Sequence, residues 1–164
     1  NSSAPVESLA EVIAFNKQNA ATEMRYFAQE LFEQAEAKGP LTDKAYLEAR
    51  DKARRLAGPE GIDVALKKDN LDALIAPSMS PAWPTDPING DHFTGAGYGA
   101  AAVARYPSIS VPMGDSHGLP LGITFMGTAW NEARLIELAY AYEQASKART
   151  PPKFQPTVVL PDAK

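Results

Sequence analysis

Apolar residues recur at helical spacing through the first part of the chain. Ser8, followed by Glu11 three positions later, has the pattern of a capping box and predicts a helix over residues 9–17. A second apolar stripe runs through residues 24–35 and predicts another helix, which the Gly-Pro pair at residues 39–40 would end. Both helices are expected to be charged on one side and apolar on the other.

A third helix is predicted after Thr42, whose hydroxyl can cap it, with an apolar stripe from Tyr46 to Ala57. The sequence GPEG at residues 58–61 is expected to break or kink this helix, and a short helical continuation follows around residues 64–66. Residues 1–70 are therefore predicted to be mainly helical.

From residue 71 the apolar positions form short runs that are typical of buried strands, at residues 71–76, 108–111 and 121–126. Residues 77–99 are dense in Pro, Gly, Asp and Asn, which predicts a long loop, and long ordered loops often carry function. Small residues over 96–105 predict a helix that can approach a neighbour closely.

The last helix is predicted to begin after Asn131, with apolar residues from Leu135 to Ala145 on its buried face. The order of helices, strand, small helix, two strands and helix indicates an α/β fold, a sheet with helices on both faces. Near-continuous apolar strands suggest burial on both faces, which indicates a wider, mixed β-sheet with neighbouring strands from outside this chain. We expect one domain over residues 1–164, with the sheet portion at 71–150 and an extended tail at 151–164.

Composition narrows the possible functions. Hydrophobic residues make up 45% of the chain and charged residues 22%, which is typical of a globular protein. The net charge of −4 makes nucleic acid an unexpected partner, and no apolar run approaches the roughly 18 residues needed to span a membrane. Cysteine is absent, which excludes disulfides, thiolate zinc sites and a cysteine nucleophile and leaves the compartment, cytoplasm or periplasm, open.

Three sequence stretches follow one another in a specific order. They are LDALIAP at residues 71–77, YPSISVPMG at 106–114 with GLPLGI at 118–123, and EARLI at 132–136. Together they resemble the C-terminal portion of the amidase-signature family. The loop stretches PAWP at 81–84 and NGDHF at 89–93 are similar to the peptide-amidase-like branch of that family.

The resemblance implies hydrolysis of a carboxamide, including the C-terminal amide of a peptide, without a cofactor. In this family a serine attacks the carbonyl, a second serine in a cis peptide relays the proton, and a lysine is the base. These groups lie in a Gly/Ser-rich stretch and upstream of it, and this sequence has no such stretch. We therefore expect no catalytic residue here and no activity from this chain alone. The opening NSSAP at residues 1–5 is not typical of a natural start, so the expected partner is a missing N-terminal part of the same polypeptide.

The predicted loop contains three candidate substrate-binding residues, Trp83, Asp91 and His92. It follows the end of a strand, where ligands bind in open α/β sheets. Trp83 would form an apolar wall, and Asp91 and His92 would contact a peptide-like substrate. The alternative is that residues 89–91 are only a turn and Trp83 only a packing residue.

Other functions remain as alternatives. The chain could be a non-enzymatic binding or scaffolding domain that self-associates through exposed sheet edges. Asp115 and His117, with Asp91 and His92, could be imagined as ligands of a metallo-hydrolase, but their spacing matches no metal pattern, and solvated histidines are favoured. The GAGYG stretch at residues 95–99 is superficially like a phosphate loop but favours close packing.

Overall fold

The computed structural model describes residues 5–154, and the chain divides into two compact units, Asn1–Glu48 and Ala49–Lys164. The boundary lies within helix α4 (Lys44–Ala57). Among the described residues, no helix combines the length and apolar character that crossing a membrane requires.

The first unit contains helices α1 (Leu9–Gln18), α2 (Ala20–Glu23) and α3 (Glu30–Glu36). Ser8 caps α1 as predicted, because its Oγ accepts a hydrogen bond from the Glu11 N–H at 3.2 Å. The Glu11 carboxylate reaches one residue further back than a capping box requires, and accepts from the Glu7 N–H.

The helix predicted over residues 24–35 is wrong as a single element, because the chain leaves helical geometry between α2 and α3. Gln29 is buried there, accepting from the Asn16 side chain at 3.0 Å and donating to the Ile13 carbonyl at 3.1 Å. The apolar stripe has no surface to cover within this unit: Phe27 is 79% exposed and Leu31 75%. Periodicity therefore predicted a helix where the unit buries a polar side chain instead.

Helix α4 begins at Lys44, one residue later than a cap at Thr42 predicts. The Leu47 N–H donates to the Asp43 carbonyl at 3.0 Å, which is the first bond of the helix and makes Asp43 the cap position.

The predicted break after α4 is a single π-helical turn, η1 (Gly58–Ile62), that leads directly into α5 (Asp63–Lys68). Pro59 is the second residue of η1, and because it has no N–H it cannot donate the i→i−4 bond that would continue α4. Gly58 packs closely against Tyr106, since a Cβ there would lie 3.0 Å from the Tyr106 ring. The chain therefore bends without stopping.

The sheet consists of β1 (Leu74–Pro77), β2 (Ser108–Ser116) and β3 (Leu119–Met126), in the order β1-β3-β2. Within the described residues every strand pairing is antiparallel. The mixed sheet expected from the sequence is a wider one, with further strands from outside this chain. β2 and β3 form a hairpin, which requires antiparallel pairing. A register shift between Pro112 and Gly114 lets β2 continue beyond its predicted end.

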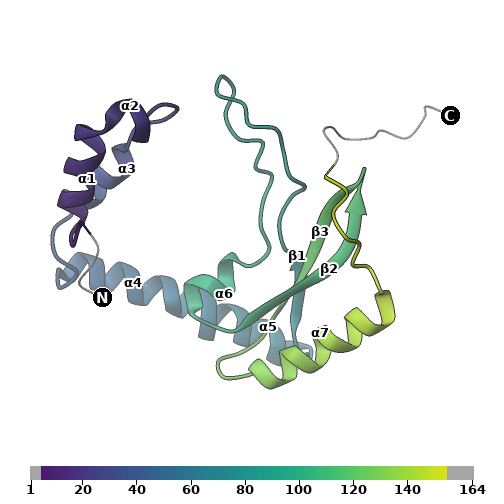
Figure 1. Ribbon diagram of the computed structural model, residues 1–164. Helices are drawn as coiled ribbons and strands as arrows, with labels where there is room; N and C mark the ends of the chain where they lie inside the picture. The colour runs from purple at the N-terminus through teal and green to yellow at the C-terminus, as the bar shows by residue number, and fades with distance from the viewer. Residues whose placement is uncertain (1–4, 155–164) are drawn as a thin grey trace. The chain divides into compact units, whose positions relative to one another are not determined.

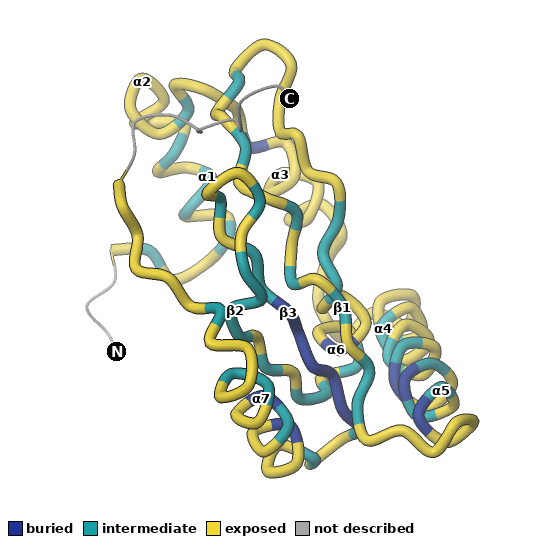
Figure 2. Tube along the Cα trace, turned by 90° about the vertical axis from the view of Figure 1, so that its right-hand side faces the viewer, coloured by how far each residue is buried: buried dark blue, intermediate teal, exposed yellow. Residues whose placement is uncertain are grey.

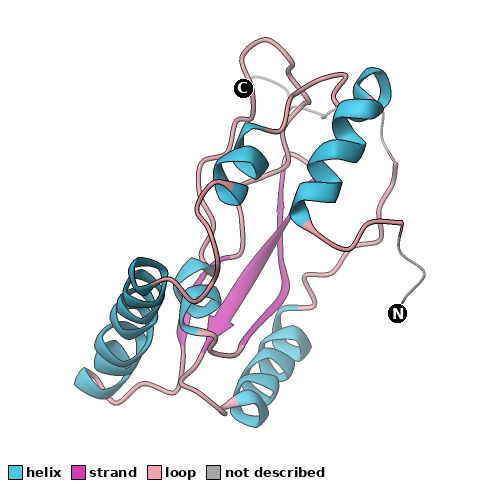
Figure 3. Ribbon diagram, turned by 90° about the vertical axis from the view of Figure 1, so that its left-hand side faces the viewer, coloured by secondary structure: helices cyan, strands magenta, loops and turns pink. Residues whose placement is uncertain are grey.

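Helices cover both faces of this sheet, as predicted (Figures 1 and 3). On one face, β3 packs against α7 (Glu132–Ser146), with Leu135 and Ala139 at 1% exposure. On the other, Met126 packs with residues of η1, α5 and α6 (Gly99–Ala104). In these strands only Ile123–Met126 is buried at every position, and Figure 2 shows this stretch of β3 in dark blue. The residues of β1 and β2 are half-buried or exposed.

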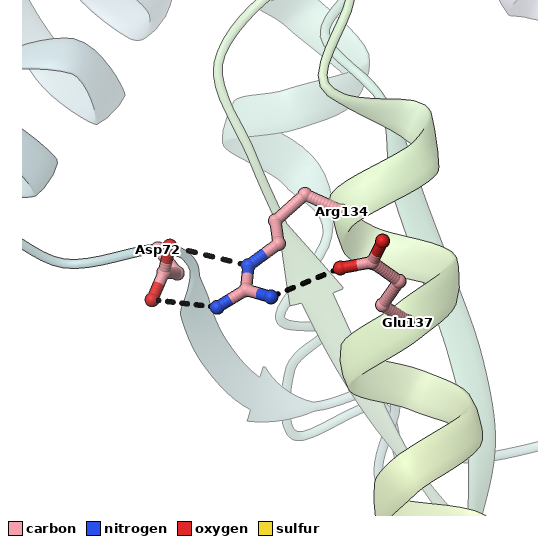
Figure 4. A network of polar contacts seen from close by, with 3 residues as sticks. All are labelled: Asp72, Arg134 and Glu137. Atoms are coloured by element: carbon pink, nitrogen blue, oxygen red, sulfur yellow. Dashed lines mark hydrogen bonds and ion pairs between the residues drawn. The ribbon is translucent and has the colours of Figure 1, made fainter.

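Helix α7 begins after Asn131 as predicted, although the Asn131 side chain makes no capping hydrogen bond. Its arginine, Arg134, donates to both carboxylate oxygens of Asp72 at 3.2 Å and to Glu137 at 2.9 Å (Figure 4). These bonds, first those to Asp72, raise the pKa of the guanidinium. The ion pair between Arg134 and Asp72 joins α7 to the segment before β1. Because both side chains are exposed, the pair contributes little to the stability of the fold.

A second polar contact ties the helical layer to both long strands. Asp63 of α5 accepts from the Tyr106 hydroxyl at 2.9 Å and from the Thr128 hydroxyl at 2.7 Å. Tyr106 precedes β2 and Thr128 follows β3. Burial raises the pKa of the Tyr106 phenol, and the bond to Asp63 raises it further.

Candidate substrate-binding site

The loop between β1 and α6 folds back on itself and is closed at its base (Figure 1). Met79 and Ala96 form an antiparallel bridge, and the Ser80 N–H donates to the Gly95 carbonyl at 3.1 Å. The Gly97 N–H donates to the Pro77 carbonyl at 3.1 Å. The two ends of the loop are therefore fixed to the end of β1.

The middle of the loop is held by Trp83. Its indole Nε1–H donates to Asp91 Oδ1 at 3.0 Å, and its ring meets the ring of Phe93 edge-on at 6.1 Å between centroids. Such edge contacts between aromatic rings are favourable. The Trp83 side chain is therefore oriented by two residues of the opposite arm.

The tip of the loop is a turn organised by Asp86. Its carboxylate accepts from the backbone N–H groups of Ile88 and Asn89 at 2.9 and 3.0 Å, and from the Asn89 side chain at 2.8 Å. These bonds, the strongest from Asn89, lower the pKa of Asp86. The turn is thus made by residues 86–89 rather than by 89–91.

A pocket of about 450 Å³ lies at the foot of this loop. Its apolar wall is formed by Met79, Ala82, Trp83 and Pro120. Ser78, Ser80 and Gly122 complete the lining. None of these described lining residues carries a charge, so the pocket suits an uncharged ligand with an apolar group.

Three hydroxyls form a closed set beside the pocket. Ser78 Oγ lies 3.1 Å from Ser110 Oγ, Ser110 Oγ lies 2.7 Å from Thr124 Oγ1, and Thr124 Oγ1 lies 2.7 Å from Ser78 Oγ. The three residues come from the end of β1, from β2 and from β3, and Ser110 is the cross-strand partner of Thr124. Thr124 is 1% exposed, and Ser78 reaches the pocket. We call this set the hydroxyl ring.

The structure places two of the three predicted site residues together. Trp83 lines the pocket, and Asp91 holds its indole. His92 is exposed on the loop and is not part of the lining. The packing role weighed against a binding role is also present, since Trp83 packs on Phe93, whereas the turn expected at residues 89–91 is formed by residues 86–89 instead.

Sequence reasoning missed Ser78, Ser110 and Thr124 as a group. Ser110 and Thr124 occupy alternate positions in apolar strands, which is the available signal, but strand register is needed to bring them together. Gly122 is part of the same arrangement, because a Cβ there would lie 2.8 Å from Ser78 Oγ.

The remaining candidates take structural roles. Asp115 Oδ1 accepts from the Gly118 N–H and His117 Nδ1 lies 3.1 Å from Ser116 Oγ, both in the β2–β3 turn. Among the described residues, no three His, Cys, Asp or Glu side chains are grouped to hold a metal ion. Gly97 packs closely on β1, since its Cβ would lie 2.4 Å from Ala76 Cβ.

Comparison with known proteins identifies relatives along most of the chain. The family model described as Amidase matches residues 5–136. A protein of Arabidopsis thaliana described as a probable amidase is 37% identical over 152 residues, which are 92% of this chain and 26% of that protein.

Two solved structures are also similar. A peptide amidase in complex with the competitive inhibitor chymostatin is 57% identical with a TM-score of 0.87, over 92% of this chain and 31% of that one. The native peptide amidase of Stenotrophomonas maltophilia is 56% identical with a TM-score of 0.83, over 92% of this chain and 30% of that one. The chain thus spans about a quarter to a third of the length of these relatives. The match to the family model and the likeness to these structures show that the chain belongs to the amidase family, with the amidase-signature fold.

Proposed function

We propose that this chain forms the substrate-pocket portion of an amidase that hydrolyses carboxamides, including the C-terminal amides of peptides. The observation that carries the proposal is the uncharged pocket behind Trp83, in a chain that is 57% identical to a peptide amidase. A carboxamide is neutral, so burying it in a pocket without charged groups costs far less than burying an ion, provided that its N–H and C=O groups find hydrogen-bond partners. That relative is a peptide amidase in complex with the competitive inhibitor chymostatin, and its name supports a peptide amide as the substrate class.

In this proposal Trp83 is the apolar wall against which a substrate side chain lies. Asp91 acts through Trp83, because it fixes the orientation of the indole. His92 is a candidate contact at the outer surface of the loop, for the part of a substrate that extends beyond the pocket.

The proposed chemistry uses a nucleophilic serine, a second serine and a lysine that lie outside these 164 residues. The serines nearest the pocket do not supply an activated nucleophile. Ser78 and Ser110 bond to each other and to Thr124, and among the described residues no basic side chain bonds to this ring. A hydroxyl needs an adjacent base to attack an amide.

Exposed apolar side chains support a partner that is part of the same polypeptide. In the first unit Tyr26, Phe27, Leu31 and Leu41 are each at least 70% exposed. Large exposed apolar patches mark surfaces that another body covers. The same side chains are expected to make the isolated chain self-associate.

The proposal predicts that the 164-residue chain hydrolyses no peptide amide, whereas the complete gene product that contains it does. The physical reason is that the pocket binds and orients a substrate but has no activated nucleophile. Ammonia release from N-acetyl-phenylalaninamide is the measurement, with the complete product and its nucleophilic Ser→Ala variant in parallel.

Activity of the isolated chain that disappears on Ser78→Ala would place the nucleophile here and contradict the proposal. Failure of the complete product to release ammonia from any carboxamide would exclude amide hydrolysis itself.

We expect Trp83→Ala in the complete enzyme to raise KM for N-acetyl-phenylalaninamide roughly tenfold and to change kcat much less. An aromatic contact is worth up to about 1.5 kcal/mol, which corresponds to about a factor of ten in affinity. Trp83→Phe keeps an aromatic wall, so its KM is expected to stay close to that of the unchanged enzyme. Ile88→Ala is the comparison on the same loop, since Ile88 is 91% exposed and outside the pocket lining, and an equal rise in KM from it would contradict the assignment of the wall to Trp83.

A further inference from the structure

The hydroxyl ring has a definite count of protons. Thr124 donates to Ser78, and Ser78 donates to Ser110. Each hydroxyl has one proton, so the Ser110 proton is left for the remaining 2.7 Å contact, to Thr124. If the donor and acceptor of each of the three hydrogen bonds are exchanged, each hydroxyl still donates one bond and accepts one. In either direction every proton of the ring is used within the ring.

The count decides what Ser78 can offer to the pocket. Each ring oxygen accepts one bond and keeps one further lone pair. Ser78 is the ring member that lines the pocket, and its backbone N–H is already committed to the Gly122 carbonyl at 2.7 Å. Ser78 therefore presents an acceptor to a ligand and no free donor.

The rest of the pocket limits which donor fits. The lining has no acidic side chain among its described residues, so a cationic donor would lose its hydration without a compensating charge. The wall of Met79, Ala82, Trp83 and Pro120 favours an apolar group beside the donor. A neutral N–H next to an apolar group meets both conditions.

We infer that Ser78 is a specificity-determining residue whose Oγ accepts a hydrogen bond from a neutral amide N–H of the ligand, with the ring holding it as an acceptor. This inference rests on the proposed function and deepens it, because it makes the pocket select an amide over the ester of the same shape. An ester has an oxygen where the amide has its N–H, and two acceptors would then face each other without a proton between them.

The test uses two probes that differ only at that position, N-methyl-3-phenylpropanamide and methyl 3-phenylpropanoate. The chain has two tryptophans, Trp83 and Trp130, and Trp130 is 92% exposed and away from the lining. In the Trp130→Phe background the indole N–H resonance of Trp83 is a single reporter of binding. We expect the amide to bind roughly three- to tenfold more tightly than the ester, the range for one neutral hydrogen bond.

Three variants separate a specificity role from a structural one. Ser78→Ala is expected to reduce the amide-to-ester ratio to about one, with ester affinity retained. Ser110→Ala frees one proton in the ring, so Ser78 can donate and the ratio is expected to fall. Thr124→Ser keeps the hydroxyl and is expected to keep the ratio.

Three outcomes overturn the inference: no binding of either probe, equal binding of both in the background chain, or an unchanged ratio in Ser78→Ala. A loss of affinity for both probes alike in Ser78→Ala would indicate a structural role and would also overturn it. The proposed function is judged separately, by ammonia release from the complete gene product.

Discussion

Leu135→Ala is expected to lower the free energy of unfolding by about 2–5 kcal/mol, the range for removing a large aliphatic side chain from a core. Leu135 is 1% exposed and forms one cluster with Ile123, Phe125 and Ala139, between α7 and the sheet. Replacing its isobutyl group by a methyl group forfeits the transfer free energy of the three lost carbons and leaves a cavity. Urea denaturation followed by far-ultraviolet circular dichroism measures the change.

The neighbouring residue is the matched control. Ile136 has the same number of carbons, lies on the same helix and is 57% exposed. Ile136→Ala is expected to change the free energy of unfolding by about 0.5 kcal/mol or less. Equal losses from the two variants would contradict the assignment of Leu135 to the core.

The second large effect is expected at Gly97, where alanine should lower the free energy of unfolding by about 1–3 kcal/mol. A Cβ at this position would lie 2.4 Å from both Ala76 Cβ and the Pro77 carbonyl oxygen. These are backbone and first side-chain atoms of β1, which cannot move aside alone. The base of the loop must therefore separate from the strand, and the Trp83 indole resonance should shift with it.

Gly99, two residues later, provides a control of opposite sign. A Cβ there meets no atom within 4 Å, and Gly99 is the first residue of α6. Gly99→Ala is expected to raise the free energy of unfolding by about 0.4–1 kcal/mol, because alanine restricts the unfolded chain. A stabilising Gly97→Ala would show that the loop does not approach β1 this closely.

Sequence patterns predicted elements well where one strand or helix face is buried within the chain itself. Helix α7 and strand β3 were found because their apolar residues face each other across one core. The helix predicted over residues 24–35 failed because its apolar stripe covers no surface in its own unit, and the buried contact belongs to Gln29. Periodicity shows that a face is apolar and does not show whether anything lies against it.

The arrangement of the candidate site could be anticipated only in part, for a related reason. Trp83 and Asp91 were singled out from the composition of one loop, and they are hydrogen-bonded within that loop. Ser78 and Thr124 are 46 positions apart and meet only through pairing of β1 with β3. Their contact depends on strand register, which short stretches of sequence do not specify. Contacts within one loop could be anticipated from the sequence, whereas contacts between residues far apart in the sequence required the structure.

The bridge between Met79 and Ala96 closes the loop segment of residues 80–95 and separates it from the supporting sheet. For a flexible segment whose ends are already joined, doubling the number of residues costs only about 0.6 kcal/mol in closure entropy. Residues 80–95 can therefore be lengthened, shortened or exchanged between homologues with little effect on the scaffold. Under the proposed function, ligand preference can then diverge while the supporting strands stay unchanged. Replacing residues 80–95 by the corresponding loop of a homologue is the direct way to alter the ligand preference proposed for the pocket.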